Sequence, residues 1–342
     1  IQGNSTNTKS VIIEVEEKAT GEISAGAGIG SDGGSFAFNV SENNWMGKGI
    51  NISTQLDVSA DSFTGGFSIS DPNYNFSGNS LTYFVSSSTN EKSDSGYKNS
   101  IITTGIGTGF EQYKNVFISP RLVASHDNLK VEDTASKSLQ KQKGTFTDLS
   151  FDYGITADNR DRVYAPTDGH ITSFSQAIPL YADSPYLKNT ATFSKYKSLS
   201  ENANATFKLY GSAINGLNDT DVRLSKRVRL PGSRLRGFEQ GKVGPKDGKD
   251  FVGGNYAVAA NFEVSLPNFL PEDTKTDVGL FLDFGNLWGV DYNKETPSSN
   301  TIRSSTGVNA SWLSPVGPMT FIFSQNLSKA STDVTQSFSF RL

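Results

Sequence analysis

One arginine in this chain stands where its charge needs a partner. It belongs to Leu235-Arg236-Gly237-Phe238, inside the longest stretch without strand-like alternation, roughly residues 216 to 253. An arginine among apolar residues is costly to bury unless an acidic group pairs with it. Two carboxylates around a guanidinium would give charge-assisted, bidentate hydrogen bonds, which is the chemistry of a tether. The alternative is an arginine that extends to solvent from a mobile outer loop.

Two nearby stretches offer acidic partners for Arg236. In residues 256–266 the apolar side chains share one face, and Glu263 lies on the other. In residues 280–285 Asp283 lies opposite the leucines. Successive side chains of a strand point to opposite faces, so both carboxylates lie on polar faces. If these strands belong to a closed barrel, Glu263 and Asp283 face its lumen.

The elements that would position these residues are strands. Apolar and polar residues alternate with period two in many stretches, and convincing helical periodicity is absent. We expect about sixteen strands, many of them about ten residues long, which is the length that crosses a bilayer when tilted. They lie near residues 22–30, 35–43, 48–58, 62–71, 79–90, 98–111, 115–130, 144–157, 168–180, 189–199, 203–214, 254–266, 276–284, 302–313, 317–326 and 334–342. An even number of antiparallel strands closes without a free edge, so the expected fold is an all-β, closed transmembrane β-barrel.

Composition agrees with a barrel and excludes several classes of function. The apolar fraction is 35%, with 23 Phe, 12 Tyr and 33 Gly, and no apolar run is long enough for a transmembrane helix. The absence of cysteine excludes disulfides, thiolate metal sites and a cysteine nucleophile. The net charge is −4, without a basic block, so nucleic acid is not an expected partner.

No enzymatic motif is present. The two histidines, His126 and His170, fall in unrelated positions. Neither a Gly-x-Ser-x-Gly elbow nor a His-Glu-x-x-His metal motif occurs. We therefore expect no catalysed bond change, no metal and no cofactor.

The first and last strands form the closing pair of the expected barrel. Strand residues 21–30 carry four glycines around Ser24, namely Gly21, Gly26, Gly28 and Gly30. Each glycine weakens a strand by about 0.5–1 kcal/mol, so this pair should open more easily than the others. An opened edge presents unpaired backbone groups that can template an incoming strand. The alternative is that the glycines only permit curvature or relieve crowding in the lumen.

The partner of that first strand is the end of the chain. Phe338, Phe340 and Leu342 alternate with polar residues there. Residues 1–20 differ from the rest: residues 11–17 look like the last strand of a small preceding domain. We expect residues 1–20 to be the end of that domain with its hinge, and residues 21–342 to be the barrel. Because the chain starts at Ile1, we expect a mature fragment of a longer protein.

Five motifs in order along the chain resemble the barrel domain of the BamA family, the outer-membrane protein assembly factors of Gram-negative bacteria. Residues 14–21 resemble the exit from the last periplasmic POTRA domain into the first strand. Residues 42–49 and 158–169 are similar to turns on the periplasmic side, and residues 252–255 are similar to the segment that re-enters the barrel. Residues 235–238 are similar to the family's VRGF loop motif, with leucine in place of the usual valine. The chain departs from the family pattern at its end, because Leu342 stands where an aromatic residue is usual.

The resemblance implies a function and its partners. The long outer loop around Arg236 would fold into the lumen, and the first and last strands would form a lateral gate that templates and inserts nascent outer-membrane proteins. The partners would be unfolded outer-membrane β-barrel proteins, accessory lipoproteins bound mainly through missing POTRA domains, and outer-membrane lipid with lipopolysaccharide. The location would be the outer membrane, with the N-terminal side in the periplasm. Two alternatives stay open: a polypeptide transporter of the two-partner secretion type, and a passive porin.

Overall fold

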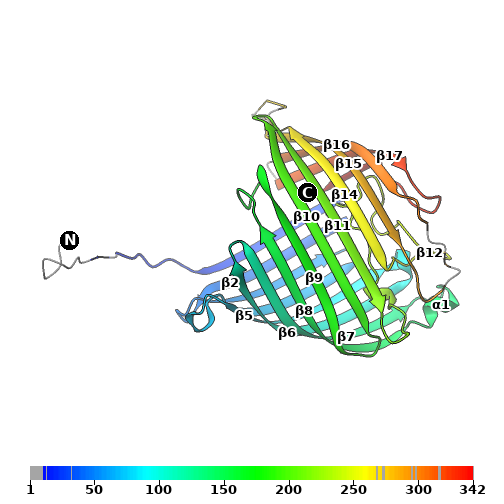
Figure 1. The fold of residues 1–342 in the computed structure, drawn as a ribbon, viewed down its shortest axis with the longest axis horizontal. Helices are drawn as coiled ribbons and strands as arrows, with labels where there is room; N and C mark the ends of the chain where they lie inside the picture. Colours follow the sequence, from blue (N-terminus) through cyan, green and yellow to red (C-terminus); the bar gives the residue numbers. More distant parts are fainter. Residues whose placement is uncertain are drawn as a thin grey trace.

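The fold is a closed antiparallel β-barrel of sixteen strands, as expected from the sequence (Figure 1). The structure is a computed structural model. It describes residues 11–12, 14–31, 33–266, 269–271, 274–293, 296, 299–314 and 317–341. No helix within these ranges is both long and apolar enough to cross a membrane.

The barrel strands follow one another around the wall in chain order, and each pairs with its neighbours. They are β1 Gly21–Gly30, β2 Gly33–Trp45, β3 Ile50–Ser59, β4 Ser62–Asp71, β5 Ser80–Lys92, β6 Tyr97–Tyr113, β7 Val116–Val131, β8 Gly144–Asp158, β9 Asp168–Ala182, β10 Tyr186–Ser200, β11 Ala203–Gly216, β14 Tyr256–Leu266, β15 Thr276–Trp288, β16 Arg303–Ser314, β17 Gly317–Ser328 and β18 Phe338–Arg341. The long loop between β11 and β14 carries a small hairpin, β12 Lys246–Asp247 with β13 Asp250–Phe251. Among the described residues, short helical pieces lie in connections at η1 Tyr74–Phe76, η2 Ser93–Ser95, α1 Lys137–Gln140 and η3 Leu224–Lys226.

Alternation along the strands sorts side chains between the outer wall and the lumen. In β14, Val258 and Phe262 are each 46% exposed, whereas Ala257 is 1% and Asn261 is 5% exposed. The exposed apolar residues cover the outside of the barrel, and the buried small or polar residues face the lumen. This is the arrangement that a strand between lipid and a polar interior requires.

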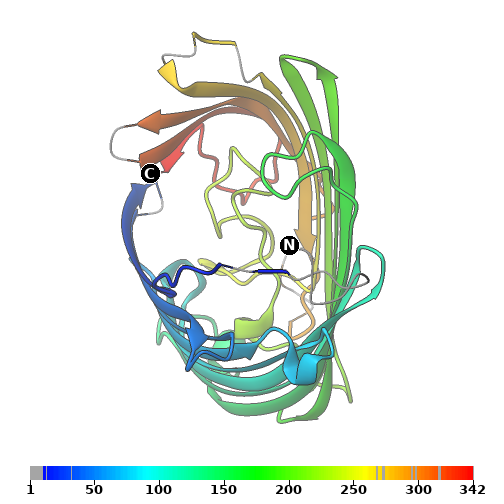
Figure 2. The same cartoon turned by 90° about the vertical axis from the view of Figure 1, so that its left-hand side faces the viewer.

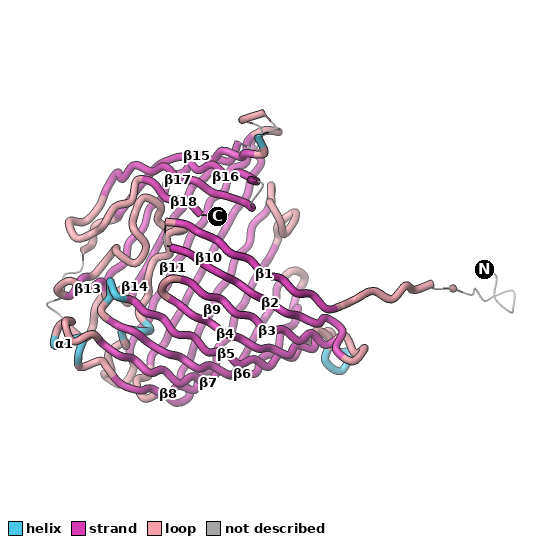
Figure 3. The backbone as a smooth tube through the Cα atoms, turned by 180° about the vertical axis from the view of Figure 1, so that it is seen from behind, coloured by secondary structure: helices cyan, strands magenta, loops and turns pink. Residues whose placement is uncertain are grey.

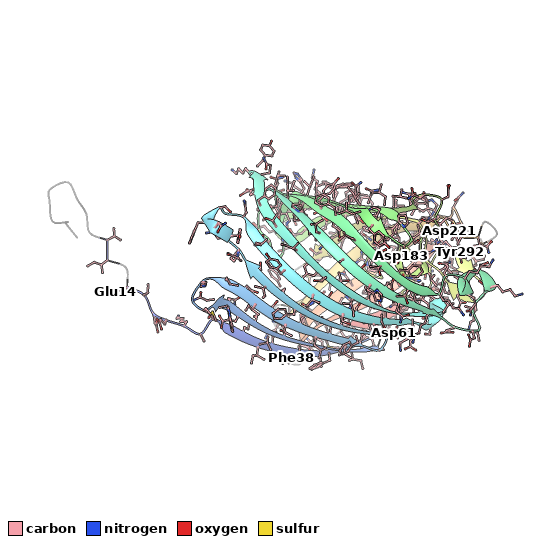
Figure 4. The ribbon with its side chains drawn as sticks, turned by 90° about the horizontal axis from the view of Figure 1, so that it is seen from below. Glu14, Phe38, Asp61, Asp183, Asp221 and Tyr292 are labelled. Carbon is pink, nitrogen blue, oxygen red and sulfur yellow. The ribbon has the colours of Figure 1, made fainter. Side chains whose placement is uncertain are left out.

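The two ends of the barrel differ. Glu14 lies on the extended segment that leads into β1, whereas Asp183, Asp221 and Tyr292 lie at the opposite end (Figure 4). We call these the N-terminal end and the far end. The connections that contain α1 and the β12–β13 hairpin are at the far end, which therefore carries the long loops.

One connection at the N-terminal end, between β8 and β9, is long and organised by a carboxylate. Asp161 accepts hydrogen bonds from the Thr167 hydroxyl at 2.8 Å, the Thr167 amide at 3.0 Å and the Asp168 amide at 3.2 Å. Chiefly because of the Thr167 hydroxyl, the pKa of Asp161 is lowered to about 2. This turn belongs to the motif of residues 158–169.

Two sequence expectations change. The last strand begins at Phe338 rather than near residue 334, because the backbone amides of Val334 and Gln336 donate to the β11–β14 loop instead of to β17. The described residues between Val11 and Thr20 form no strand. The division of the chain at residue 20 therefore stays a prediction.

Candidate functional site: the lumen tether and the seam

The loop between β11 and β14 lies inside the barrel (Figure 2). Leu235 is 2% and Phe238 is 4% exposed. Both belong to one apolar cluster with Ala257, Ala259 and Leu287 of β14 and β15. This part of the lumen wall is apolar, so the loop is held against it by burial as well as by polar contacts.

Arg236 contacts both carboxylates expected from the strand pattern. Its Nε and Nη2 donate to the two oxygens of Asp283, each at 2.8 Å, and its Nη1 donates to Glu263 Oε2 at 2.7 Å. The Arg236 side chain is 9% exposed, that of Glu263 28% and that of Asp283 0%. The loop arginine and two strands of the wall therefore form one charged cluster, which we call the lumen tether.

Neighbouring groups complete the lumen tether. The Arg236 backbone amide donates to Asp283 Oδ2 at 3.1 Å, and Asn261 Nδ2 donates to Asp283 Oδ1 at 2.9 Å. The guanidinium carbon lies 3.7 Å from the centroid of the Phe281 ring. Each Asp283 oxygen thus accepts two hydrogen bonds, as a fully buried carboxylate needs.

Gly237 fits a crowded position next to Arg236. Its φ is +86°, and a Cβ atom there would lie 3.1 Å from Ser305 Cβ and 3.2 Å from Ser324 Oγ. Its carbonyl accepts hydrogen bonds from Asn326 Nδ2 at 2.8 Å and from the Gln336 amide at 3.0 Å. The arginine is therefore followed by glycine because the backbone turns there and passes close to β16 and β17.

The first and last strands meet over a short distance, which we call the seam (Figure 3). Their pairing consists of Gly30 with Arg341. The Ser31 amide also donates to Phe340 O at 2.9 Å, and the Phe340 amide donates to Ser31 Oγ at 2.9 Å. Within the described residues, positions 21–29 of β1 have no partner on this side, and β18 ends at Arg341.

The glycines of β1 differ in their surroundings. At Gly30 a Cβ atom would lie 2.7 Å from Phe340 O, so close approach of β18 explains this glycine. At Gly21 the nearest atom would be Glu42 Oε2 at 3.3 Å, whereas at Gly26 nothing lies within 4 Å. Crowding therefore does not account for Gly26. Gly28 and Ser24 pair with β2.

On the other side of the seam, Phe338 and Phe340 lie in β18. The ring of Phe338 packs against Phe323 of β17, with centroids 5.0 Å apart. Leu342 lies outside the described residues. A cavity of about 570 Å³ has both Arg236 and Glu263 of the lumen tether and Gly30 and Phe340 of the seam in its lining. The two features therefore border one space inside the barrel.

Sequence reasoning missed three further ion pairs of the far end, two of them buried on both sides and the third partly buried. Arg303 of β16 pairs with Asp333, Arg223 of the loop pairs with Asp148 of β8, and Arg227 pairs with Asp291. Asp148 is the only one of these carboxylates that lies in a barrel strand, β8. The other carboxylates and the loop arginines lie in irregular segments, where no periodicity marks a side chain as buried.

Within the described ranges, no three His, Cys, Asp or Glu side chains gather in a way that could hold a metal ion. His126 bonds to Thr147, and His170 packs against Phe193 on the outer wall.

The chain matches known proteins over most of its length. The family model of the Omp85 superfamily domain covers residues 44–342. Among curated proteins, the outer membrane protein assembly factor BamA of Neorickettsia risticii is 25% identical, over 89% of this chain and 42% of that protein. The factor of the same name from Neisseria meningitidis is 26% identical, over 96% of this chain and 47% of that protein. The chain thus spans less than half the length of these relatives.

Solved structures share the fold. The BamA structure from Haemophilus ducreyi lacking POTRA domains 1–3 aligns with a TM-score of 0.88 at 23% identity, covering 96% of this chain and 70% of that one. CdiB from Escherichia coli aligns less well, with a TM-score of 0.60 at 14% identity, covering 96% and 63% of the two chains.

Proposed function

Because this chain belongs to the Omp85 superfamily, we propose that it is the membrane-embedded barrel of an assembly factor that inserts β-barrel proteins into the bacterial outer membrane. The incoming protein's terminal strand pairs with the edge of β1, and its hairpins enter the bilayer through the seam. The N-terminal end faces the periplasm, where residues 1–20 connect to POTRA domains. Accessory lipoproteins bind mainly there, and outer-membrane lipid and lipopolysaccharide surround the wall. No covalent bond is made or broken in this process.

One observation carries the proposal. Among the described residues, β1 and β18 share a single residue pair, whereas β17 and β18 share four and β1 and β2 share ten. Opening the seam therefore disrupts far fewer backbone hydrogen bonds than opening the neighbouring joint between β1 and β2. The freed edge of β1 presents unpaired amide and carbonyl groups, to which an extended peptide can add as a strand.

The lumen tether supports the same function. Arg236 joins the loop to β14 and β15, two of the last strands before the seam. A rigid wall on this side fixes the position from which β18 pairs with β1. The tether is thus a brace that favours the competent barrel.

The test is disulfide crosslinking in cells, with the full-length protein and a stalled outer-membrane substrate. Cysteine replaces Ser24 in β1, and single cysteines are placed along the terminal strand of the substrate. These 342 residues contain no cysteine, so once any cysteine elsewhere in the full-length protein is replaced by serine, every crosslink comes from the chosen positions. We expect crosslinks in one register, with alternate substrate positions reacting.

The matched control is Ser53→Cys. Ser53 lies in β3, which pairs on both sides with Ser41 of β2 and Ser68 of β4. A register-specific pattern at Ser24 and none at Ser53 supports templating at the seam. Equal crosslinking at both positions would favour a transporter that passes an extended polypeptide through the lumen.

The porin alternative predicts a different conductance across a planar bilayer. A porin needs a continuous water path, whereas here the β11–β14 loop fills part of the lumen. In planar bilayers we expect low steady conductance. A large, constant conductance through the folded barrel would favour the passive porin.

A further inference from the structure

The connection between β17 and β18 turns into the lumen and bonds to the loop that carries Arg236. The Glu239 amide donates to Val334 O at 3.0 Å, and the Val334 amide donates to Lys242 O at 3.1 Å. Phe238 and Thr335 form an antiparallel bridge. The chain that leads into β18 is therefore paired with the lumen loop before it is paired with the barrel wall.

Asp333 fixes the start of this paired segment. Both of its oxygens accept from Arg303, at 2.8 Å from Nε and 3.0 Å from Nη2, and both side chains are 0% exposed. The Gly244 amide of the loop donates to Oδ1 at 3.3 Å, and the Ala330 amide donates to Oδ2 at 2.7 Å. One carboxylate thus joins β16, the lumen loop and the β17–β18 connection.

Arg303 is itself held by the barrel wall. It is the first residue of β16, and its Nη1 donates to Asn286 Oδ1 of β15. The same nitrogen donates to Thr301 O at 3.3 Å. A fully buried guanidinium with these partners has one defined position. Because it is anchored to the wall, it also fixes the position of Asp333 relative to the wall.

We propose that Arg303 and Asp333 are positioning residues for the seam. They clamp the lumen loop to the segment that precedes β18, and so set where Phe338–Arg341 lies relative to β1. As far as the structure describes it, the strand is four residues long and pairs with β17 over those four and with β1 at one, so its own pairing holds it weakly. Only the consequence for substrate insertion rests on the proposed function, because the position of β18 is a property of the barrel alone.

A distance measurement tests the clamp without any substrate. Spin labels on cysteines at Ser24 in β1 and Ser339 in β18 report the width of the seam by pulsed electron resonance. A second pair, at Ser53 and Ser175, spans the barrel away from the seam. In Asp333→Asn we expect the Ser24–Ser339 distribution to shift and broaden, while the Ser53–Ser175 distribution stays unchanged.

Two further variants separate positioning from general damage. Asp161→Asn makes the same change in the β8–β9 turn, away from the seam, and is expected to leave both distributions unchanged. If Asp333→Asn does not fold, Arg303→Lys keeps a cation beside Asp333 with fewer hydrogen bonds, and is expected to cause a smaller broadening. Folding is checked in each case by the heat-dependent migration of the barrel on gels.

The outcomes separate the clamp from the function. An unchanged Ser24–Ser339 distribution in folded Asp333→Asn or Arg303→Lys overturns the clamp, whatever the rate of substrate assembly. A broadened distribution supports it. If the broadened variant inserts substrate barrels into liposomes at the normal rate, the clamp stands and the insertion of substrates through the seam is contradicted.

Discussion

Arg236 and Asp283, 47 positions apart in the chain, are joined by two hydrogen bonds of 2.8 Å between the guanidinium and the carboxylate. The carboxylate has no exposed surface, and the arginine comes from the loop that lies inside the barrel. The pair therefore has a structural consequence that an exposed ion pair would not have. Removing either charge leaves the other buried.

Removing the arginine side chain should destabilise the barrel. We expect Arg236→Ala to lower the free energy of unfolding by about 3–5 kcal/mol, because Asp283 then remains as a buried, uncompensated charge. Urea titration of the purified barrel in detergent, followed by its migration on gels, measures this loss. Arg234→Ala is the matched control in the same loop: this arginine stacks on Tyr210, at 4.4 Å from the ring centroid, and should cost only about 0.5–1 kcal/mol. Equal stability of Arg236→Ala and the natural chain would contradict the tether.

The two carboxylates of the lumen tether should differ in their effect. Asp283 is fully buried and accepts four hydrogen bonds, whereas Glu263 is 28% exposed and accepts one from Arg236 and one from Asn309 at 3.3 Å. We expect Asp283→Asn to cost about 3–5 kcal/mol, as for a broken buried pair. Glu263→Gln should cost about 1 kcal/mol or less, because solvent screens the pair. The same urea titration compares them, and the reverse order would show that the burial of Asp283 does not decide the energetics.

Gly237 should resist substitution more strongly than a glycine with similar backbone geometry. Both Gly237 and Gly241 have positive φ, +86° and +81°, so alanine at either costs roughly 1–2 kcal/mol in backbone strain. At Gly237 the new Cβ atom also meets Ser305 at 3.1 Å, whereas at Gly241 nothing lies within 4 Å. We therefore expect Gly237→Ala to be the less stable variant. Identical unfolding curves for the two variants would mean that β16 gives way at no cost.

The β8–β9 turn should be sensitive to acid only at very low pH. The pKa of Asp161 lies at about 2, below its ordinary value of 3.8, so the folded turn favours the ionised form. A lowered pKa contributes stability that is present above the unfolded value and is lost as pH falls through the folded value. We expect carbon NMR of the labelled carboxyl to titrate near pH 2, and the Thr167 amide signal to move with it. A titration near 3.8 would show that the Thr167 contact is absent in solution.

The sequence by itself determined the strands and their two faces. Alternation is a local property, because a strand between lipid and a polar lumen needs an apolar residue at every second position. The sixteen barrel strands, and the lumen-facing position of Glu263 and Asp283, follow from it. The sequence also marked the four glycines of residues 21–30 as unusual, with a weak seam and barrel curvature or crowding as alternative reasons.

Tertiary structure decided which distant groups meet. No local pattern marks Asp333 as the partner of Arg303, because Asp333 lies in a connection and its position depends on a loop from another part of the chain. For the same reason the last strand is shorter than its alternation indicates: the amides of Val334 and Gln336 bond to the lumen loop rather than to a neighbouring strand. Backbone groups take whichever partner the closed barrel brings within reach, and only the folded molecule specifies that partner.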